Sequence, residues 1–567
     1  MPDPQPKRPD GIDAPACDFD AVIVGAGFAG LYSLHRLRGM GLSARVFEIA
    51  SGVGGTWFWN RYPGARCDVE SMEYSYQFDD ALQQEWEWTE RYATQPEILR
   101  YLNHVADRFD LRRDIRFNTR VNAATFDETA GNWTIETDDG ARVTATHCIM
   151  ASGCLSARNI PDFKGIDSFA GTTCHTGDWP EEDVDFSGQR VGIIGTGSSA
   201  IQCIPLIAEQ AEHLYVFQRT PNYSVPAFNA PLEPEVQKAV KADYAGLRAR
   251  ARQNRSGIDF AVNETGVFEV GLEERDAVYE ERWQTCGIGF LGAFSDLFAT
   301  AEANDTAAEF VRSKIRETVR DPAVAELLSP HYHIGCKRTC VDTDYYATYN
   351  RDNVTLVDVG ETPIEEITRA GLRVGDREYE FDTLIFATGF DAMTGPLTRI
   401  DIRGIGGRSL AEKWKVGPRS LLGVATAGFP NLHIIAGPGS PSVLSNMVQS
   451  IEQNVEWIAD CIGYMRENGL ACVEATVEAE DAWVAHVNEV ADATLYTKTK
   501  SWYIGSNIPG KAPVFMPYIG FPDYVRRCDE VVAKGYAGFS FVERSDAPVT
   551  AELRTLAAQK MRQRSVV

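Results

Sequence analysis

Apolar residues near the start of the chain follow the order strand, turn, helix, strand. The apolar run 21–24 leads into three glycines within 25–30, and leucines then recur at helical spacing over 31–37. A second apolar run, ARVFEIA at 44–50, follows directly. A short apolar run that changes to a 3.6-residue period and back is typical of a βαβ unit. We therefore predict a Rossmann-like nucleotide-binding unit here.

The same pattern returns in QRVGIIGTGSSAIQCIPLIAEQAEHLYVFQRT, at 189–220. Two glycines and an alanine hold the turn positions between 195 and 200. From the first turn glycine to the residue that ends the second strand is 23 residues in the first copy and 24 in this one. The chain therefore carries two dinucleotide-binding units, and we predict an α/β fold with two Rossmann-like domains.

The residue at the end of the second strand distinguishes the two ligands. Glu48 can accept hydrogen bonds from both ribose hydroxyls and would repel a 2′-phosphate, which indicates the ADP half of FAD. Arg219 can hold a 2′-phosphate with its guanidinium, which indicates NADPH at the second site. Two other interpretations stay open: tight turns that bind no ligand, and a surface ion pair for Arg219.

Other segments predict how the rest of the chain is organised. The segment TQPEILRYLNHVADRF, at 94–109, has an apolar stripe typical of a core-facing helix, and charged helical patterns dominate from about 232 to 328. ASG at 151–153 and ATG at 387–389 each close an apolar strand and suit crossings between the two units. We predict a disordered tail over 1–18, an FAD domain over 19–152 and 387–545, an NADP domain over 153–222 and 333–386, a helical insertion over 223–332, and a helical tail over 546–567.

Composition excludes several classes of protein. The 567 residues are 44% hydrophobic and 24% charged, which is typical of a globular chain, and 55 basic against 80 acidic residues leave a net charge of −25. That charge argues against nucleic acid and anionic membranes as partners. The sequence has neither a long apolar run nor a secretory signal, and its 12 cysteines form neither a CxxC pair nor a zinc-ligand ladder. We expect a cytoplasmic protein without a metal site, and a disulfide reductase is disfavoured.

Two further segments carry candidate chemistry. In SGVGGTWFWNRYPGARCDVES, glycines let the backbone approach a flat ligand, and the aromatic residues indicate a ring-binding lining rather than only core. The string FAGTTCHTGDWP, at 169–180, fits F-x-G-x3-H-x3-W-P, which this composition makes improbable by chance. For His175 within it, a structural or hinge role is favoured over a catalytic one.

These strings together resemble the type I Baeyer–Villiger monooxygenases, from about residue 20 to 536. The resemblance implies bound FAD and NADPH, and conversion of ketones to esters or lactones with O2 through a flavin C4a-peroxide, with sulfoxidation as a possible side activity. It also implies that Arg338 stabilises the anionic peroxide and that Asp68 positions Arg338. The expected partners are a small ketone and O2, in a monomer or weak homo-oligomer.

The resemblance extends to individual positions. Predicted contacts with FAD are Gly25, Gly27, Phe28, Gly30, Glu48, Gly55, Thr56, Trp57, Trp59, Asp68, Tyr74, Val121 and Met447. Predicted contacts with NADPH are Gly195, Thr196, Gly197, Ser198, Ser199, Ala200, Gln202, Arg219, Thr220, Lys337, Arg338 and Trp502, the last in a mobile segment. The predicted substrate pocket is the loop Ser442, Val443 and Leu444.

Two alternatives stay open. A flavin monooxygenase that oxidises amines or sulfides shares both dinucleotide sites, but its motif typically lacks the ending Trp179–Pro180. A non-catalytic flavin-binding sensor has no evident use for an Asp68–Arg338 pair.

Overall fold

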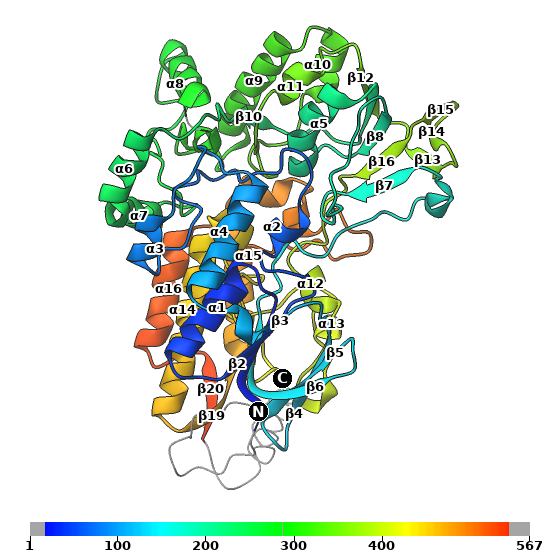
Figure 1. Ribbon diagram of the computed structural model, residues 1–567. Helices are drawn as coiled ribbons and strands as arrows, with labels where there is room; N and C mark the ends of the chain where they lie inside the picture. The colour runs from blue at the N-terminus through cyan, green and yellow to red at the C-terminus, as the bar shows by residue number, and fades with distance from the viewer. Residues whose placement is uncertain (1–16, 286, 544–567) are drawn as a thin grey trace, which may run out of the picture.

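The computed structural model describes residues 17–285 and 287–543, and it places two α/β units one above the other with a helical region on top (Figure 1). The predicted α/β class with two Rossmann-like units and a helical insertion is confirmed. The predicted tails lie outside the described residues, apart from positions 17 and 18. The predicted domain boundaries stay predictions.

The first unit is built on an eight-stranded sheet in the order β17-β4-β5-β6-β1-β2-β3, with β18 also paired to β6. The central strands β1, β2 and β6 are parallel, as in a Rossmann unit, whereas β4, β5 and β6 pair antiparallel. The strands are β1 Phe19–Val24, β2 Ala44–Phe47, β3 Ile115–Arg116, β4 Val121–Asp127, β5 Asn132–Thr137, β6 Arg142–Met150, β17 Asp401–Arg403 and β18 Leu432–Ile434.

Helices from both ends of the chain cover this sheet, and α1 lies beside α14 in Figure 1. The α-helices are α1 Phe28–Gly39, α2 Thr56–Trp59, α3 Asp80–Glu85, α4 Gln95–Arg108, α12 Gly395–Thr398, α13 Leu410–Lys413, α14 Met447–Glu467, α15 Val477–Asp492 and α16 Phe521–Ala533. The short 3-10 helices of this part are η1 Arg112–Asp114, η4 Ile405–Gly407, η5 Ser442–Leu444, η6 Leu495–Lys498 and η7 Trp502–Ile504, and the last strands pair as β19 Leu470–Ala475 with β20 Phe539–Glu543.

The second unit is a five-stranded parallel sheet in the order β12-β9-β8-β16-β7. Its strands are β7 Thr172–His175, β8 Arg190–Ile194, β9 His213–Gln218, β12 Val354–Asp358 and β16 Thr383–Phe386, and its helices are η2 Ile166–Ser168, α5 Ser198–Gln210 and α11 Tyr345–Thr348. A three-stranded antiparallel sheet beside it comprises β13 Ile364–Ile367, β14 Gly371–Val374 and β15 Arg377–Glu380.

The insertion is helical, as predicted, but it begins with a short strand. Its elements are α6 Pro234–Ala242, α7 Tyr244–Gln253, α8 Leu272–Thr285, η3 Gly287–Gly292, α9 Ala301–Thr318 and α10 Pro322–Leu328. The strand β10 Ser224–Pro226 pairs with β11 Cys340–Asp342, more than 100 residues later. This pairing brings the segment that follows the insertion back to the end of the second unit.

Each nucleotide-binding turn packs on the strand end where the chain crosses to the other unit. A Cβ on Gly25, at φ +105°, would lie 2.6 Å from the carbonyl oxygen of Ala151. A Cβ on Gly195, at φ +111°, would likewise run into the carbonyl oxygen of Ala387. The two crossings therefore pass directly beneath the two turns, because only glycine permits such a close approach.

The apolar stripe predicted at 94–109 forms one face of α4. Ile98, Leu102 and Val105 are fully buried in the core of the first unit, and Phe109 packs against it. Within the described residues, no helix combines the length and the apolar character that crossing a bilayer would require.

We predict that Gly30→Ala destabilises the first unit, because the added Cβ would run into the carbonyl oxygen of Gly25. Such overpacking of a backbone contact should lower the free energy of unfolding by at least about 2 kcal/mol in urea titrations. Gly39→Ala is the matched control in the same helix, where a Cβ meets no atom within 4 Å. That change should be neutral or stabilising, and equal losses in the two variants would contradict the prediction.

Candidate active site

The carboxylate of Glu48 closes the first glycine turn. The backbone N–H of Ala26 donates to its Oε2 at 2.6 Å, and the N–H of Ala50 donates to its Oε1 at 2.8 Å. Burial raises the pKa of Glu48, and these donors oppose the rise. A carboxylate has about four acceptor positions, and the backbone donors of Ala26, Ala50 and Ile49 do not use all of them. The group therefore fits the ribose hydroxyls of a dinucleotide.

Two glycine segments face each other backbone to backbone at this turn. A Cβ on Gly55, at φ +54°, would lie 3.0 Å from the Cα of Gly27. A Cβ on Gly27 would lie 3.4 Å from the Cα of Gly55. The predicted turn and the predicted GG segment therefore come together in space and leave the backbone accessible to a pyrophosphate.

Three predicted aromatic residues meet beside the turn. The indole N–H of Trp57 donates to the Tyr74 hydroxyl at 3.2 Å, and the Phe28 ring lies edge-on to Tyr74 at 5.4 Å. All three are buried, and burial raises the pKa of Tyr74, so its hydroxyl stays neutral. Thr56, which starts α2, is exposed, and Trp59, which ends it, is half-buried.

Val121 stands apart from this group. It lies on β4 in a separate core cluster with Val24 and Phe47, whereas Met447 packs against the cluster of Tyr74. The structure thus places Met447 with Tyr74 in one cluster and Val121 in another. Its predicted contact with FAD stays a prediction.

The second glycine turn is more open than the first. A Cβ on Gly197 would meet no atom within 4 Å, whereas Ala200 is fully buried against the sheet. The Thr196 hydroxyl donates to the carbonyl oxygen of Thr220 at 3.0 Å, which ties the turn to the end of β9. The Ser199 hydroxyl lies 2.9 Å from that of Thr176. The turn therefore offers free space at the start of α5, where backbone N–H groups favour an anion.

Two cations from distant segments influence each other electrostatically beyond this turn. Arg219 is exposed at the end of β9, and the Lys337 ammonium lies 4.2 Å above the ring of Tyr332. Burial and the charge of Arg219 lower the pKa of Lys337 to about 8. Two like charges held together are stabilised by an anion between them, so this pair fits a 2′-phosphate.

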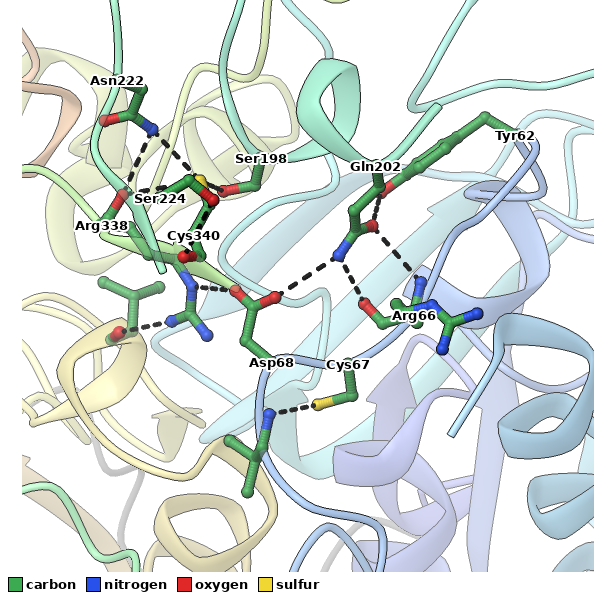
Figure 2. A network of polar contacts seen from close by, with 12 residues as sticks. Tyr62, Arg66, Cys67, Asp68, Ser198, Gln202, Asn222, Ser224, Arg338 and Cys340 are labelled. Carbon is green, nitrogen blue, oxygen red and sulfur yellow. Dashed lines mark hydrogen bonds and ion pairs between the residues drawn. The ribbon is translucent and has the colours of Figure 1, made fainter. Parts of the chain in front are cut away.

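The buried carboxylate of Asp68 pairs with Arg338 across the two units. The guanidinium Nε donates to Asp68 Oδ2 at 2.9 Å, and Nη1 donates to the carbonyl oxygen of Val443 at 3.5 Å (Figure 2). Burial alone would lower the pKa of Arg338, but Asp68 and Tyr503 raise it above its ordinary value. The side chain as a whole keeps 28% of its surface exposed, so it is not fully enclosed. The arrangement can stabilise negative charge that develops beside it.

The other oxygen of Asp68 is held by α5. Gln202 Nε2 donates to Asp68 Oδ1 at 3.4 Å, and Figure 2 shows the amide between Asp68, Arg66 and Tyr62. Sequence reasoning named Gln202 as a coenzyme contact and placed Tyr62 only among the aromatic residues of a ring-binding lining. It missed Asn222, whose amide donates to the carbonyl oxygen of Arg338. One signal for a shared role of Gln202 and Ser198 was available in the sequence. They are four residues apart, which places both on one helix face.

The predicted substrate loop lies next to the guanidinium. Ser442 is buried at φ +42°, a strained conformation for serine, and its hydroxyl donates to the carbonyl oxygen of Ala436 at 3.1 Å. Val443 shares an apolar cluster with Tyr503, and Leu444, Met447 and Trp502 pack against it. The structure therefore brings the loop 442–444 and the segment of Trp502 to Arg338.

The string FAGTTCHTGDWP joins the two units. The backbone N–H of Trp179 donates to the carbonyl oxygen of Trp59 at 3.1 Å. Burial lowers the pKa of His175 to about 4, its Nδ1 accepts from the Gly177 N–H, and its ring lies edge-on to Phe390. A neutral, enclosed imidazole fits a structural role better than proton transfer. Among the described residues, no cluster of three or more His, Cys, Asp or Glu could hold a metal ion.

Comparisons with known proteins agree with this architecture. The family model described as pyridine nucleotide-disulphide oxidoreductase matches residues 22–321. A Baeyer-Villiger monooxygenase of Pseudooceanicola batsensis is 47% identical over 92% of this chain and 95% of its own length. A phenazine N-monooxygenase of Lysobacter antibioticus is 42% identical over 93% of this chain and 98% of its own. The solved structure of an oxidized steroid monooxygenase bound to NADP has 52% identity and a TM-score of 0.89, covering 93% of this chain and all of that one.

Proposed function

Because this chain belongs to the Baeyer–Villiger monooxygenase family, we propose that it uses NADPH and O2 to convert ketones to esters or lactones at the Asp68–Arg338 pair. The observation that carries the site assignment is a charged guanidinium held by a buried carboxylate beside the predicted substrate loop.

The two cofactors fit the two turns. Glu48 and the facing glycines would hold the ADP half of FAD, and Arg219 and Lys337 would hold the 2′-phosphate of NADPH. When bound, FAD accepts the hydride of NADPH and activates O2, which protein side chains alone cannot do.

Arg338 supplies a positive charge that does not titrate. Negative charge develops on oxygen while an oxygen atom is inserted next to a carbonyl, and a fixed guanidinium stabilises that charge without reorganising. Asp68 keeps the guanidinium in place through Nε, and Nη1 donates to the carbonyl oxygen of Val443. Loop 442–444 and the segment of Trp502 pack around the same point and would exclude water.

We expect Arg338→Ala to separate coenzyme consumption from oxygen insertion. NADPH oxidation should continue, whereas ester formation should fall at least about 100-fold, because one electrostatic stabiliser of the transition state is lost. The measurement is ester by gas chromatography against NADPH consumed. Arg320→Ala, at an exposed arginine of the insertion, is the matched control. A normal ester yield from the Arg338 variant would remove the assignment.

Arg219→Ala should weaken NADPH more than NADH. The loss of a charged hydrogen bond to the 2′-phosphate corresponds to about 1.5–3 kcal/mol, or roughly 10- to 150-fold in the ratio of kcat/KM values for the two coenzymes. Arg219→Lys, which keeps the charge, should lose less of the ratio. An equal loss for NADPH and NADH would show that Arg219 does not contact the 2′-phosphate.

Coenzyme preference should also depend on pH through Lys337. Its pKa of about 8 means that the ammonium is charged at pH 7 and is lost as pH rises through 8. The NADPH-to-NADH ratio of kcat/KM should therefore fall by about tenfold between pH 7 and 9.5, since one charge-assisted contact disappears. Lys337→Arg should hold the ratio high and flat with pH, and Lys337→Gln should make it low and flat. A ratio that falls equally in all three proteins would rule out Lys337 as the titrating group.

The likeness to a phenazine N-monooxygenase favours oxygenation of heteroatoms as a second activity, and we propose sulfoxidation as a side reaction. Product analysis with a ketone and a thioether in one vessel tests the order of preference. We expect the ester to predominate. A sulfoxide formed without any ester would contradict this order of preference.

We further propose that the protein acts in the cytoplasm, as a monomer or weak homo-oligomer, without nucleic-acid partners. No two cysteines among the described residues form a disulfide with each other, which suits a reducing compartment. The net charge of −25 opposes binding to phosphate backbones.

A further inference from the structure

One face of helix α5 contacts Asp68 and the segment that carries Arg338. Ser198 and Gln202 are four residues apart and so lie on the same face. Gln202 contacts Asp68, and Ser198 contacts Cys340, which follows Arg338 by two residues (Figure 2). The helix whose first turn faces the predicted NADPH site is thus the element against which the ion pair is assembled.

The amide of Gln202 has no hydrogen-bonding capacity left for a coenzyme. Its Oε1 accepts from the Tyr62 hydroxyl at 2.9 Å and from the Arg66 N–H at 3.3 Å. Its Nε2 donates to the Arg66 carbonyl oxygen at 3.1 Å and to Asp68 Oδ1 at 3.4 Å. A primary amide offers two donors and two acceptor positions, and all four are used. Its orientation is therefore fixed, with one N–H directed at Asp68.

The loop that carries Asp68 lies on the helix backbone. Gly64, at φ +79°, leaves room for no side chain, because a Cβ there would lie 2.5 Å from the carbonyl oxygen of Gln202. The same atom would lie 3.1 Å from Leu206 on the next turn of α5. Loop 62–68 of the first unit and helix α5 of the second therefore pack as one body.

The start of the same helix contacts the segment of Arg338. The Ser198 hydroxyl lies 3.1 Å from the Cys340 sulfur. Asn222 Nδ2 donates to the carbonyl oxygen of Arg338 at 3.3 Å and to the Cys340 sulfur at 3.2 Å. Helix α5 thus contacts both sides of the ion pair. Gln202 contacts Asp68, and Ser198 contacts the segment of Arg338 through Cys340.

We propose that Gln202 is a positioning residue that sets the Asp68–Arg338 geometry from the coenzyme-binding helix. The proposal rests on the proposed function, and it assigns Gln202 to the ion pair rather than to direct contact with NADPH. Occupancy of the turn at the start of α5 and the place of the guanidinium are then linked through a single helix. Oxygen insertion, rather than coenzyme affinity, should depend on Gln202.

The first test is Gln202→Leu in the FAD-loaded enzyme, with Gln210→Leu as the matched control. Gln210 is exposed at the far end of the same helix. In the Gln202 variant, ester formed per NADPH consumed should fall at least about fivefold, with hydrogen peroxide rising, while KM for NADPH stays within about twofold. A wild-type ester yield, or a loss seen only in KM for NADPH, would overturn the proposal.

The second test is Gln202→Glu, with Gln210→Glu as the control, over pH 6 to 8.5. An ionised carboxylate cannot donate to Asp68 and repels it, whereas a protonated one can donate as the amide does. The ester yield of this variant should therefore recover toward that of the wild type as pH falls. The yield of Gln202→Leu should show no such recovery. A purely structural role would give the same pH profile in both variants, and that result would overturn the proposal.

A third measurement keeps this proposal separate from the proposed function. Gln202→Leu and Arg338→Met should give non-additive shifts in Tm when combined, because both act on Asp68. This result is independent of turnover, so it supports the positioning role of Gln202 even if the wild-type protein forms no ester from any ketone. Absence of ester from the wild type would contradict the proposed function. Additive Tm shifts would contradict the positioning role of Gln202.

Discussion

A charged guanidinium held at the junction of two domains is the constraint on which the rest of this structure depends. Asp68 and Arg338 are 270 residues apart in sequence, and each lies on an irregular segment without its own framework. Arg338 would be costly to hold half-buried without the carboxylate, since an unpaired charge loses its hydration. The pair therefore forms only when both units are folded and packed together. Its geometry depends on how the two units contact each other.

The chain order explains how this contact is made. The first unit is interrupted after β6 and resumed at β17 and β18, and the second unit fills the interval. Both crossings run beneath the glycine turns, against Gly25 and Gly195. A shift of one unit against the other would therefore move the backbone at both glycine turns. The chemistry that we propose at this junction would let each coenzyme influence the guanidinium.

The string FAGTTCHTGDWP serves the same junction. Its Trp179 binds the backbone of Trp59 in the first unit, and its Thr176 meets Ser199 at the turn of the second. His175 lies enclosed between them with a lowered pKa. These contacts account for an unusual combination of residues that take no direct part in the chemistry we propose. The segment therefore connects the second glycine turn with Trp59 of the first unit.

Local patterns determined much of this protein. Two βαβ units, the predicted ligand preference of Glu48 and Arg219, and the buried stripe of α4 all follow from short-range periodicity and strand-end chemistry, which the chain carries within about 30 residues. The family resemblance then paired Asp68 with Arg338, which no spacing in the chain could do. Only the tertiary structure decided that Gln202 faces Asp68, that the charge of Arg219 acts on Lys337, that Val121 and Tyr74 pack in different clusters, and that β10 pairs with β11. Each of these depends on contacts between segments far apart in sequence, and such contacts are selected by the packing of whole domains rather than by the residues around each position.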